Sequence, residues 1–203
     1  MSDLAVLEVT QLRLKGVAPD DPSLHKNLSL VRGILRTQSV FYSCIQDPTL
    51  LFILGIWPSL EAHREFLASS RAAEVLGPQE AMLDFVWSAH MELDAMAALP
   101  LDAPVLSLTR RTVKGHDVDA YDKTWAKERR AMLEGSKHRV ASGWRLDAAP
   151  GTHEFIIFAG WESAEAHAAF DAGQSEPGNG DGSSPLYETM TIHTAWNVEA
   201  TRA

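Results

Sequence analysis

An internal repeat constrains the fold of this chain more than any other feature of its sequence. Residues 6–16 (VLEVTQLRLKG) match residues 105–115 (VLSLTRRTVKG), with Val, Leu, Thr, Lys and Gly recurring at an offset of 99. A second block, 57–66, recurs in 161–170 at an offset of 104, sharing Trp, Ser, Glu, Ala, His and Phe. A period near 100 residues is typical of a duplicated domain, because solenoid repeats are about 20 to 50 residues long. The sequence therefore predicts two tandem copies of one fold.

Each copy shows the same order of predicted elements. Apolar residues at helical spacing, such as Leu24, Leu28 and Leu35, predict helices, and short apolar runs bounded by turn residues predict strands. The predicted strands are 4–14, 39–46, 50–57, 83–93, 103–114, 138–147, 152–161 and 187–199. The predicted helices are 23–37, one that follows Ser59, 118–135 and 163–172. The order is βαββαβ in each half.

In this topology both helices cover one face of a four-stranded antiparallel sheet, so the other face needs a partner. The second copy supplies that partner. We therefore expect an α+β fold in which two ferredoxin-like βαββαβ halves, with antiparallel sheets, pack into an intrachain pseudo-dimeric α/β barrel. We place the first half at 1–95, an Ala/Pro linker at 96–104 and the second half at 105–203. The Gly-rich segment 173–185 predicts a mobile loop.

The charge and the hydropathy of the chain indicate which partners and which cellular location to expect. A net charge of −9 and a pI near 5.3 argue against nucleic acid or a membrane surface as partner. No apolar run reaches the roughly 20 residues needed to cross a bilayer, and the N-terminus lacks the pattern of a secretory leader. We therefore expect a cytoplasmic protein. The single cysteine, Cys44, lies in the apolar segment VFYSCI, which predicts a buried thiol and excludes an internal disulfide.

The repeated blocks resemble the dimeric α/β-barrel superfamily, in particular its antibiotic-biosynthesis monooxygenase-like domains. The resemblance is carried by an apolar strand that ends in Trp, followed by Ser and a Glu-Ala-His helix. These are GIWPSLEAHREF in one copy and AGWESAEAHAAF in the other. The resemblance implies a class that includes cofactor-free oxygenases acting on aromatic polyketides, haem-degrading enzymes, cyclases, decarboxylases, isomerases and stress-responsive proteins. The fold alone does not choose among them.

Two departures from the family pattern argue against haem. Family members often have a second His about one turn after the Glu-Ala-His, where Phe66 and Phe170 stand here. Haem-degrading members have an Asn on the first strand, near the positions of Thr10 and Thr109. HExxH, paired-Cys, phosphate-loop and Gly-x-Ser-x-Gly motifs are also missing from the sequence. We therefore expect no metal and no other cofactor.

The histidines divide into duplicated and non-duplicated positions. His63 and His167 lie on the inner faces of equivalent helices, where a core histidine bonded to the backbone is the more frequent role. His90 and His193 lie on the last strands, and an alignment of these strands at an offset of 105 does not make them equivalents. Because imidazole transfers protons near neutral pH, His193 is our main candidate for a catalytic base, against the alternative of a solvated strand end.

Side-chain volume points to the second half as the place of a ligand cavity. The second helix of this half has Ala164 and Ala168 where the first half has Leu60 and Arg64. The second half also holds four of the six Trp residues. Small residues beside large aromatic ones predict space for a small apolar or aromatic organic ligand, with segment 173–185 as a lid. The predicted catalytic residues are His193, His167 and Tyr187, and the predicted substrate-binding residues are Trp125, Trp161, Trp196, Thr109 and Trp144.

Two functions follow from these patterns. The first is a cofactor-independent enzyme of polyketide or aromatic secondary metabolism, such as an oxygenase, cyclase, decarboxylase or isomerase, which transfers a proton in an apolar pocket. The second is a non-catalytic ligand-binding or stress-responsive protein. A closed cavity containing a polar pair favours the enzyme, whereas a core filled through both halves favours the binding protein. A homodimer is compatible with either function.

Overall fold

The computed structural model of the chain describes residues 4–174 and 186–200. The chain divides into two compact units. The first unit comprises Met1–Met96 together with Trp196–Ala203, and the second unit comprises Ala97–Ala195. The two ends of the chain therefore belong to the same unit.

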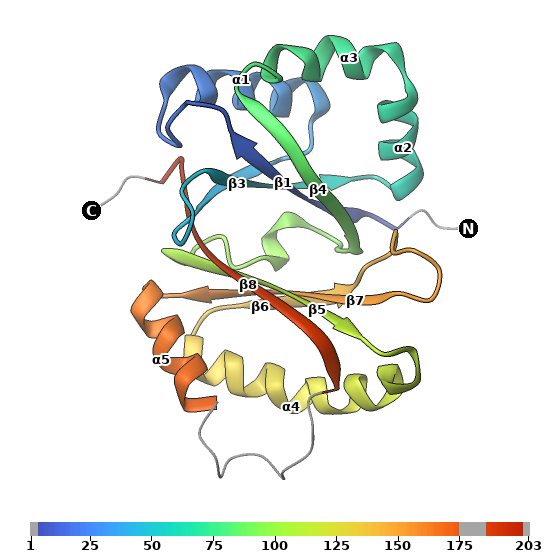
Figure 1. Cartoon of the computed structure of the whole chain (residues 1–203), viewed down its shortest axis with the longest axis vertical. Helices are drawn as coiled ribbons and strands as arrows, with labels where there is room; N and C mark the ends of the chain where they lie inside the picture. The colour runs from blue at the N-terminus through green and yellow to red at the C-terminus, as the bar shows by residue number, and fades with distance from the viewer. Residues whose placement is uncertain (1–3, 175–185, 201–203) are drawn as a thin grey trace. The chain divides into compact units, whose positions relative to one another are not determined.

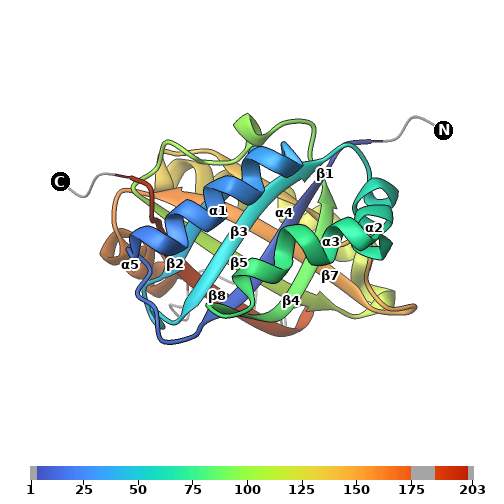
Figure 2. The same cartoon turned by 90° about the horizontal axis from the view of Figure 1, so that it is seen from above.

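The first unit contains four strands, three α-helices and a 3-10 helix. In chain order these are β1 (Val6–Leu14), α1 (Pro22–Leu35), β2 (Val40–Cys44), β3 (Leu50–Trp57), α2 (Leu60–Ala68), α3 (Ser70–Leu76), the 3-10 helix η1 (Gly77–Gln79) and β4 (Leu83–Glu92). All three α-helices lie on one face of the strands (Figure 1). Seen from above, α1 and α3 run across β3, β1 and β4 (Figure 2).

The strands of the first unit pair in the order β4, β1, β3, β2, all antiparallel. Glu8 of β1 lies opposite His90 of β4 on one side and Gly55 of β3 on the other. Further along β1, beyond a β-bulge, Leu12 lies opposite Phe85 of β4. Side chains two residues apart on a strand share a face, so Glu8 and Leu12 mark two levels of the same face.

Serine caps begin the second helix of each half. The Oγ of Ser59 accepts a hydrogen bond from the Ala62 amide at 3.1 Å, and the Oγ of Ser163 accepts one from the Ala166 amide at 3.1 Å. Such a cap satisfies one of the amide groups that the first turn leaves without a partner. The predicted start of this helix after Ser59 is confirmed.

The second unit repeats this order of elements. A short 3-10 helix, η2 (Met96–Ala98), lies at the boundary between the units, and the elements that follow are β5 (Val105–Val113), the 3-10 helix η3 (Gly115–Asp117), α4 (Val118–Ser136), β6 (Val140–Trp144), β7 (His153–Trp161), α5 (Ala164–Gln174) and β8 (Tyr187–Asn197). Its strands pair in the order β8, β5, β7, β6, which is the order of the first unit copied strand by strand. The predicted α+β class with two ferredoxin-like βαββαβ halves is confirmed. An origin by tandem duplication stays a prediction.

One predicted segment falls mostly outside the described residues. Of the Gly-rich stretch 173–185, the first two residues continue α5, and 175–185 lie outside the part of the chain that the structure describes. The lid that we expected there stays untested.

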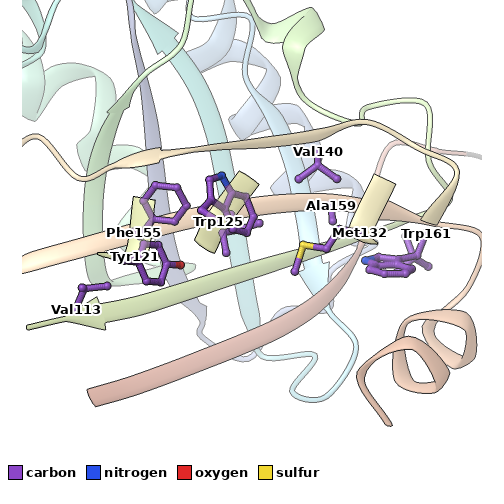
Figure 3. Packing of buried hydrophobic residues seen from close by; sticks show 10 residues of the cluster. Val113, Tyr121, Trp125, Met132, Val140, Phe155, Ala159 and Trp161 are labelled. Carbon is purple, nitrogen blue, oxygen red and sulfur yellow. The ribbon is translucent and has the colours of Figure 1, made fainter. Parts of the chain in front are cut away.

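The two units have cores of different composition. In the second unit, Phe155 packs edge-on against Tyr121 and Trp125, with ring centroids 5.1 and 5.2 Å apart (Figure 3). Trp144 packs on the same ring at 4.9 Å. The buried cluster of the first unit is mainly aliphatic and consists of Leu14, Leu24, Leu28, Phe41, Leu51, Leu83 and Val198.

Candidate functional site

A cavity of about 300 Å³ lies in the first unit, between its helices and the sheet. Residues of β1, β3 and β4 line its floor, and residues of α1, α2 and α3 line its walls. Its lining is mostly apolar, which is typical of a site for a small organic ligand. The cavity that we predicted in the second half, between α5 and its sheet, stays a prediction.

One helix position and the core of the second unit weaken the volume argument for that prediction. Arg64 is exposed, so its replacement by Ala168 in the second half removes no volume from the interior. Bulky side chains from other elements, namely Trp125, Trp144 and Phe155, fill the second unit. Volume lost on one helix was therefore recovered elsewhere.

A carboxylate lies at one end of the cavity of the first unit. Glu8 Oε1 accepts a hydrogen bond from the Thr10 hydroxyl at 2.6 Å, and Oε2 accepts one from the Trp57 indole at 2.6 Å. The Glu8 side chain is 19% exposed, and it lines the cavity together with Thr10 and Trp57. Two neutral donors thus hold the carboxylate in place and leave it open to the cavity.

A histidine from α2 completes the polar end. His63 is buried, and its ring stacks on Trp57 with centroids 4.5 Å apart at an angle of 25°. Its Nε2 lies 3.6 Å from Glu8 Oε2, and its Nδ1 lies 2.7 Å from Nε2 of His90. One nitrogen of that 2.7 Å pair must donate and the other accept, so the two imidazoles share a proton. His90 is buried too, but it lies behind His63 and does not line the cavity.

Two hydroxyl groups lie on the far side of β3 from Glu8. Thr37 and Ser39 line the cavity, and their hydroxyl oxygens are 2.6 Å apart. They occupy the space above Gly55, where a Cβ would approach the Ser39 Oγ to 2.5 Å. Glycine at this position therefore allows a row of polar groups to cross the sheet from Glu8 to Ser39.

The second unit keeps the helix part of this arrangement and changes the strand part. Trp161 lies against His167 with ring centroids 4.8 Å apart, as Trp57 does against His63. The Trp161 indole donates to the Ser107 hydroxyl at 2.8 Å, where Trp57 has a carboxylate as its partner. His167 Nδ1 lies 3.1 Å from the Thr194 hydroxyl instead of a second imidazole.

The carboxylate partner of the second histidine comes from another element. His167 Nε2 lies 3.3 Å from Asp171, which is one turn further along the same helix and is 44% exposed. Burial lowers the pKa of His167 below its ordinary value of 6.5, and the charge of Asp171 opposes this effect. Burial therefore favours the neutral form of this imidazole, and its carboxylate partner comes from its own helix instead of from a strand.

These contacts correct our alignment of the last strands. His63 to His90 and His167 to Thr194 both span 27 residues, so the offset between β4 and β8 is 104 and not 105. His90 is thus equivalent to Thr194. Because Thr194 faces α5, strand alternation directs His193 to the opposite face of the sheet. His193 is half-buried there.

The other predicted site residues are distributed as follows. Trp125 and Trp161 belong to the packed core of the second unit, and Trp144 and Tyr187 pack against that core. Thr109 is buried on β5, opposite Ile157. Trp196 packs against the core of the first unit, so the structure does not bring all the predicted residues together. Their catalytic and binding roles stay predictions.

Arg111 occupies the position where the first unit has Leu12. It is 6% exposed and forms an ion pair with Glu128, and its guanidinium lies 4.9 Å from the centre of the Tyr187 ring. The pKa of Arg111 is raised, since the pairing with Glu128 outweighs the opposite effect of burial. Burial raises the pKa of nearby Tyr121 to about 12. This polar cluster fills space that the first unit leaves open.

Sequence reasoning missed two residues of the candidate site, Glu8 and His90. A signal for Glu8 was present, because the repeat pairs it with Ser107 at an inward position of the first strand. A charged residue that replaces a small neutral one on a core-facing position needs a reason. His90 met the same criterion as His193, a non-duplicated histidine on a last strand, and His193 was chosen instead.

The described residues offer neither a cluster of metal ligands nor a helix that could span a membrane. Within 4–174 and 186–200, no three or more His, Cys, Asp or Glu side chains are grouped closely enough to hold a metal ion. None of the helices in these ranges combines the length and the apolar character needed to cross a membrane.

Comparisons with known proteins show a shared fold. No family profile and no curated protein sequence matches this chain. A candidate monooxygenase from Fusobacterium nucleatum matches 98% of this chain and 94% of its own, with a TM-score of 0.61 and 10% identity. An anthrone oxidase-like protein matches 95% of this chain and 91% of its own, with a TM-score of 0.57 and 14% identity.

A variant of chlorite dismutase from Candidatus Nitrospira defluvii matches 98% of this chain and 94% of its own, with a TM-score of 0.58 and 11% identity. At such low identities, these matches establish the fold and nothing more specific. They support the two-halved α+β fold.

Proposed function

We propose that this protein is a small-molecule enzyme of the oxygenase type that works without a cofactor. It removes a proton from an apolar or aromatic ligand held in the cavity of the first unit. The observation that supports this most directly is that Glu8 and His63 both reach the same largely apolar cavity, 3.6 Å from each other. A proton acceptor and a proton donor placed side by side in a largely apolar pocket are what such chemistry requires.

The proposal gives each residue a role that its contacts support. Glu8 is the base, because its carboxylate faces the cavity and is held by the donors Thr10 and Trp57. His63 places an N–H beside the carboxylate when His90 donates to its Nδ1, and this N–H stabilises negative charge that develops on the ligand. His90 positions His63 and does not touch the ligand.

The hydroxyl pair of Thr37 and Ser39 adds neutral donors at the same level of the sheet. Arg32, the cation nearest to them in the lining, is engaged by Glu199, with nitrogen to oxygen distances of 2.7 and 2.9 Å. The polar end thus combines a carboxylate with neutral donors. This favours a ligand that gives up a proton over one that already carries a negative charge.

An oxygenase reaction follows from proton removal when dioxygen is the oxidant. Loss of a proton from an activated CH2 group gives a delocalised anion, which passes its electrons to O2. One oxygen atom becomes the new carbonyl, and the other leaves as water with the two hydrogens of the CH2 group. The names of two similar structures, a candidate monooxygenase and an anthrone oxidase-like protein, support this choice over the other reactions of the class.

Anthrone is a suitable probe, because its CH2 group is acidic and its oxidation is visible. We expect the protein to accelerate oxygen uptake with anthrone, and to accelerate exchange of the CH2 protons in D2O without oxygen. The variant His63→Gln should slow both reactions by about 10² to 10⁴-fold. The matched variant His167→Gln, which changes the equivalent residue of the second unit, should leave both rates unchanged.

Two outcomes would contradict the proposal. Rates equal to those in buffer for the wild-type protein would remove the enzyme assignment and leave the non-catalytic binding protein. Loss of activity in His167→Gln together with full activity in His63→Gln would move the site to the second unit and to the residues first predicted there. The assignment to polyketide or aromatic secondary metabolism, the homodimer and the cytoplasmic location remain predictions.

A further inference from the structure

We propose that the cavity takes an amphipathic ligand, with a hydroxyl-bearing head at Glu8 and an apolar tail that leaves the cavity over Phe85 and Leu67. The inference deepens the proposed function and rests on its assignment of Glu8 as the group that meets the head. It is carried by the strand register, by the exposed fractions of the lining residues and by a difference between the units.

The register of β1 gives the cavity a polar end and an apolar end. At the level of Glu8, the neighbouring groups across the sheet are His90 and, above Gly55, Ser39. Four residues along the strand lies Leu12, opposite Phe85. At roughly 3.3 Å per residue, these two levels are about 13 Å apart. Polar and apolar groups therefore occupy opposite ends of one elongated space.

Apolar side chains from four elements line the cavity away from Glu8. Leu28 of α1, Ile53 of β3, Leu76 of α3 and Leu83 of β4 all face the cavity. Leu28 and Leu83 are almost completely buried. This part of the lining accepts a hydrocarbon group, because burial of apolar surface is favourable and needs no directed partner.

Two lining residues at the rim are apolar and exposed. Phe85 is 67% exposed and Leu67 is 51% exposed, although both face the cavity. Single exposed apolar residues are common and need no explanation. Here, however, two of them border one cavity whose interior is already apolar, so a ligand that emerges from it covers both. Glu80, also exposed at the rim, disfavours an anionic tail.

The second unit supports this interpretation by contrast. The residue equivalent to Leu67 at the offset of 104 is Asp171, which pairs with His167. The second unit thus has a charged carboxylate beside the histidine at the position where the first unit has an exposed apolar side chain. The apolar rim is therefore a property of the unit that holds the cavity, and the shared fold does not require it.

A homologous series of 4-alkylphenols, from ethyl to octyl, tests the inference by isothermal titration calorimetry on the full chain. Each methylene that becomes buried should tighten binding by about fourfold. We expect this gain to continue to the longest tails in the wild-type protein. In Phe85→Ser the gain should stop at the longer members, while the short members bind as before. Leu67→Ser should show the same effect to a smaller degree.

Leu30→Ser is the matched control. Leu30 is 60% exposed on α1 but does not line the cavity, so the whole series should bind this variant as it binds the wild type. Binding by all members without any dependence on tail length would overturn this inference and leave the proposed function standing. So would equal losses in Leu30→Ser and Phe85→Ser. Failure of every member to bind the wild-type protein would overturn both proposals.

Discussion

The two units of this protein share a helix motif and differ in what the strands place beneath it. In both units a Trp at the end of a strand packs on a His of the following helix. In the first unit the strands add Glu8 and His90, and in the second they add Ser107 and Thr194. The Trp–His contact is thus common to both units. The titratable groups that differ between them, Glu8 and His90, lie on the strands.

The units also differ in how their interiors are filled. The first leaves a cavity of about 300 Å³ between helices and sheet, lined mostly by aliphatic and aromatic residues and, at one end, by the polar group around Glu8. In the second, Trp125, Tyr121 and Phe155 pack edge to face in the corresponding layer (Figure 3). The comparison shows that one βαββαβ frame accommodates either a ligand space or an aromatic core.

The largest expected effect compares two isoleucines at equivalent positions. Ile157 is 1% exposed in the core of the second unit, and Ile53 lines the cavity of the first. Ile157→Ala should lower the free energy of unfolding by about 2 to 5 kcal/mol, because it opens a hole in a close-packed core. Ile53→Ala should cost less, because it only widens a space that already exists. Denaturant unfolding measures both, and equal losses would show that the first unit is packed as tightly as the second.

An intermediate effect is expected when His90 is changed to the residue of the other unit. His90→Thr gives His63 the partner that His167 has, and so removes the shared proton between two imidazoles. We expect the turnover number for anthrone to fall on the order of ten- to hundredfold, as when partners of metal-bound histidines are removed. The Michaelis constant should change little. An unchanged turnover number in His90→Thr would assign His90 a purely structural role.

The smallest effect concerns stability against pH in the second unit. Because burial lowers the pKa of His167 below 6.5, the unfolded chain takes up a proton first as the pH falls through that value. The stability that the neutral histidine contributes is therefore present above about pH 6.5 and is lost below it. The free energy of unfolding should fall less between pH 7.5 and 5.5 in His167→Gln than in the wild type. A steeper fall of the free energy of unfolding in the variant would mean that the pKa of His167 is raised by folding instead of lowered.

Much of the fold was predictable because the same pattern of apolar and turn residues occurs in both halves of the sequence. The strand β3 was predicted at its observed bounds, and the helix that follows Ser59 begins where its cap predicts. The period-two and helical patterns are local, and two copies confirm one another. Two kinds of difference remain: element ends shifted, as in β2, which is shorter than the predicted 39–46, and α3 was not among the predicted elements.

The site was harder to predict, because a cavity is a sum over elements that are distant in sequence. The volume above the sheet of the second unit depends on Trp125 of α4 and Phe155 of β7 at least as much as on the Ala residues of α5. Whether Arg64 contributes volume depends on its being exposed, which its sequence neighbours do not show. In the same way, an offset changed by one residue moves a strand side chain to the other face, and this concealed the relation between His90 and Thr194.

The C-terminal end of the chain has a consequence for the order in which the protein matures. Val198 lies in the core of the first unit, and its amide donates a hydrogen bond to the Phe41 carbonyl. Glu199 forms an ion pair with Arg32. Both Phe41 and Arg32 line the cavity. A ribosome makes these last contributors only after it has made the whole of the second unit. The N-terminal unit is therefore the first to be synthesised and the last to be completed. A nascent chain that stops before Trp196 lacks the residues that pack against Phe41 and pair with Arg32 beside the cavity.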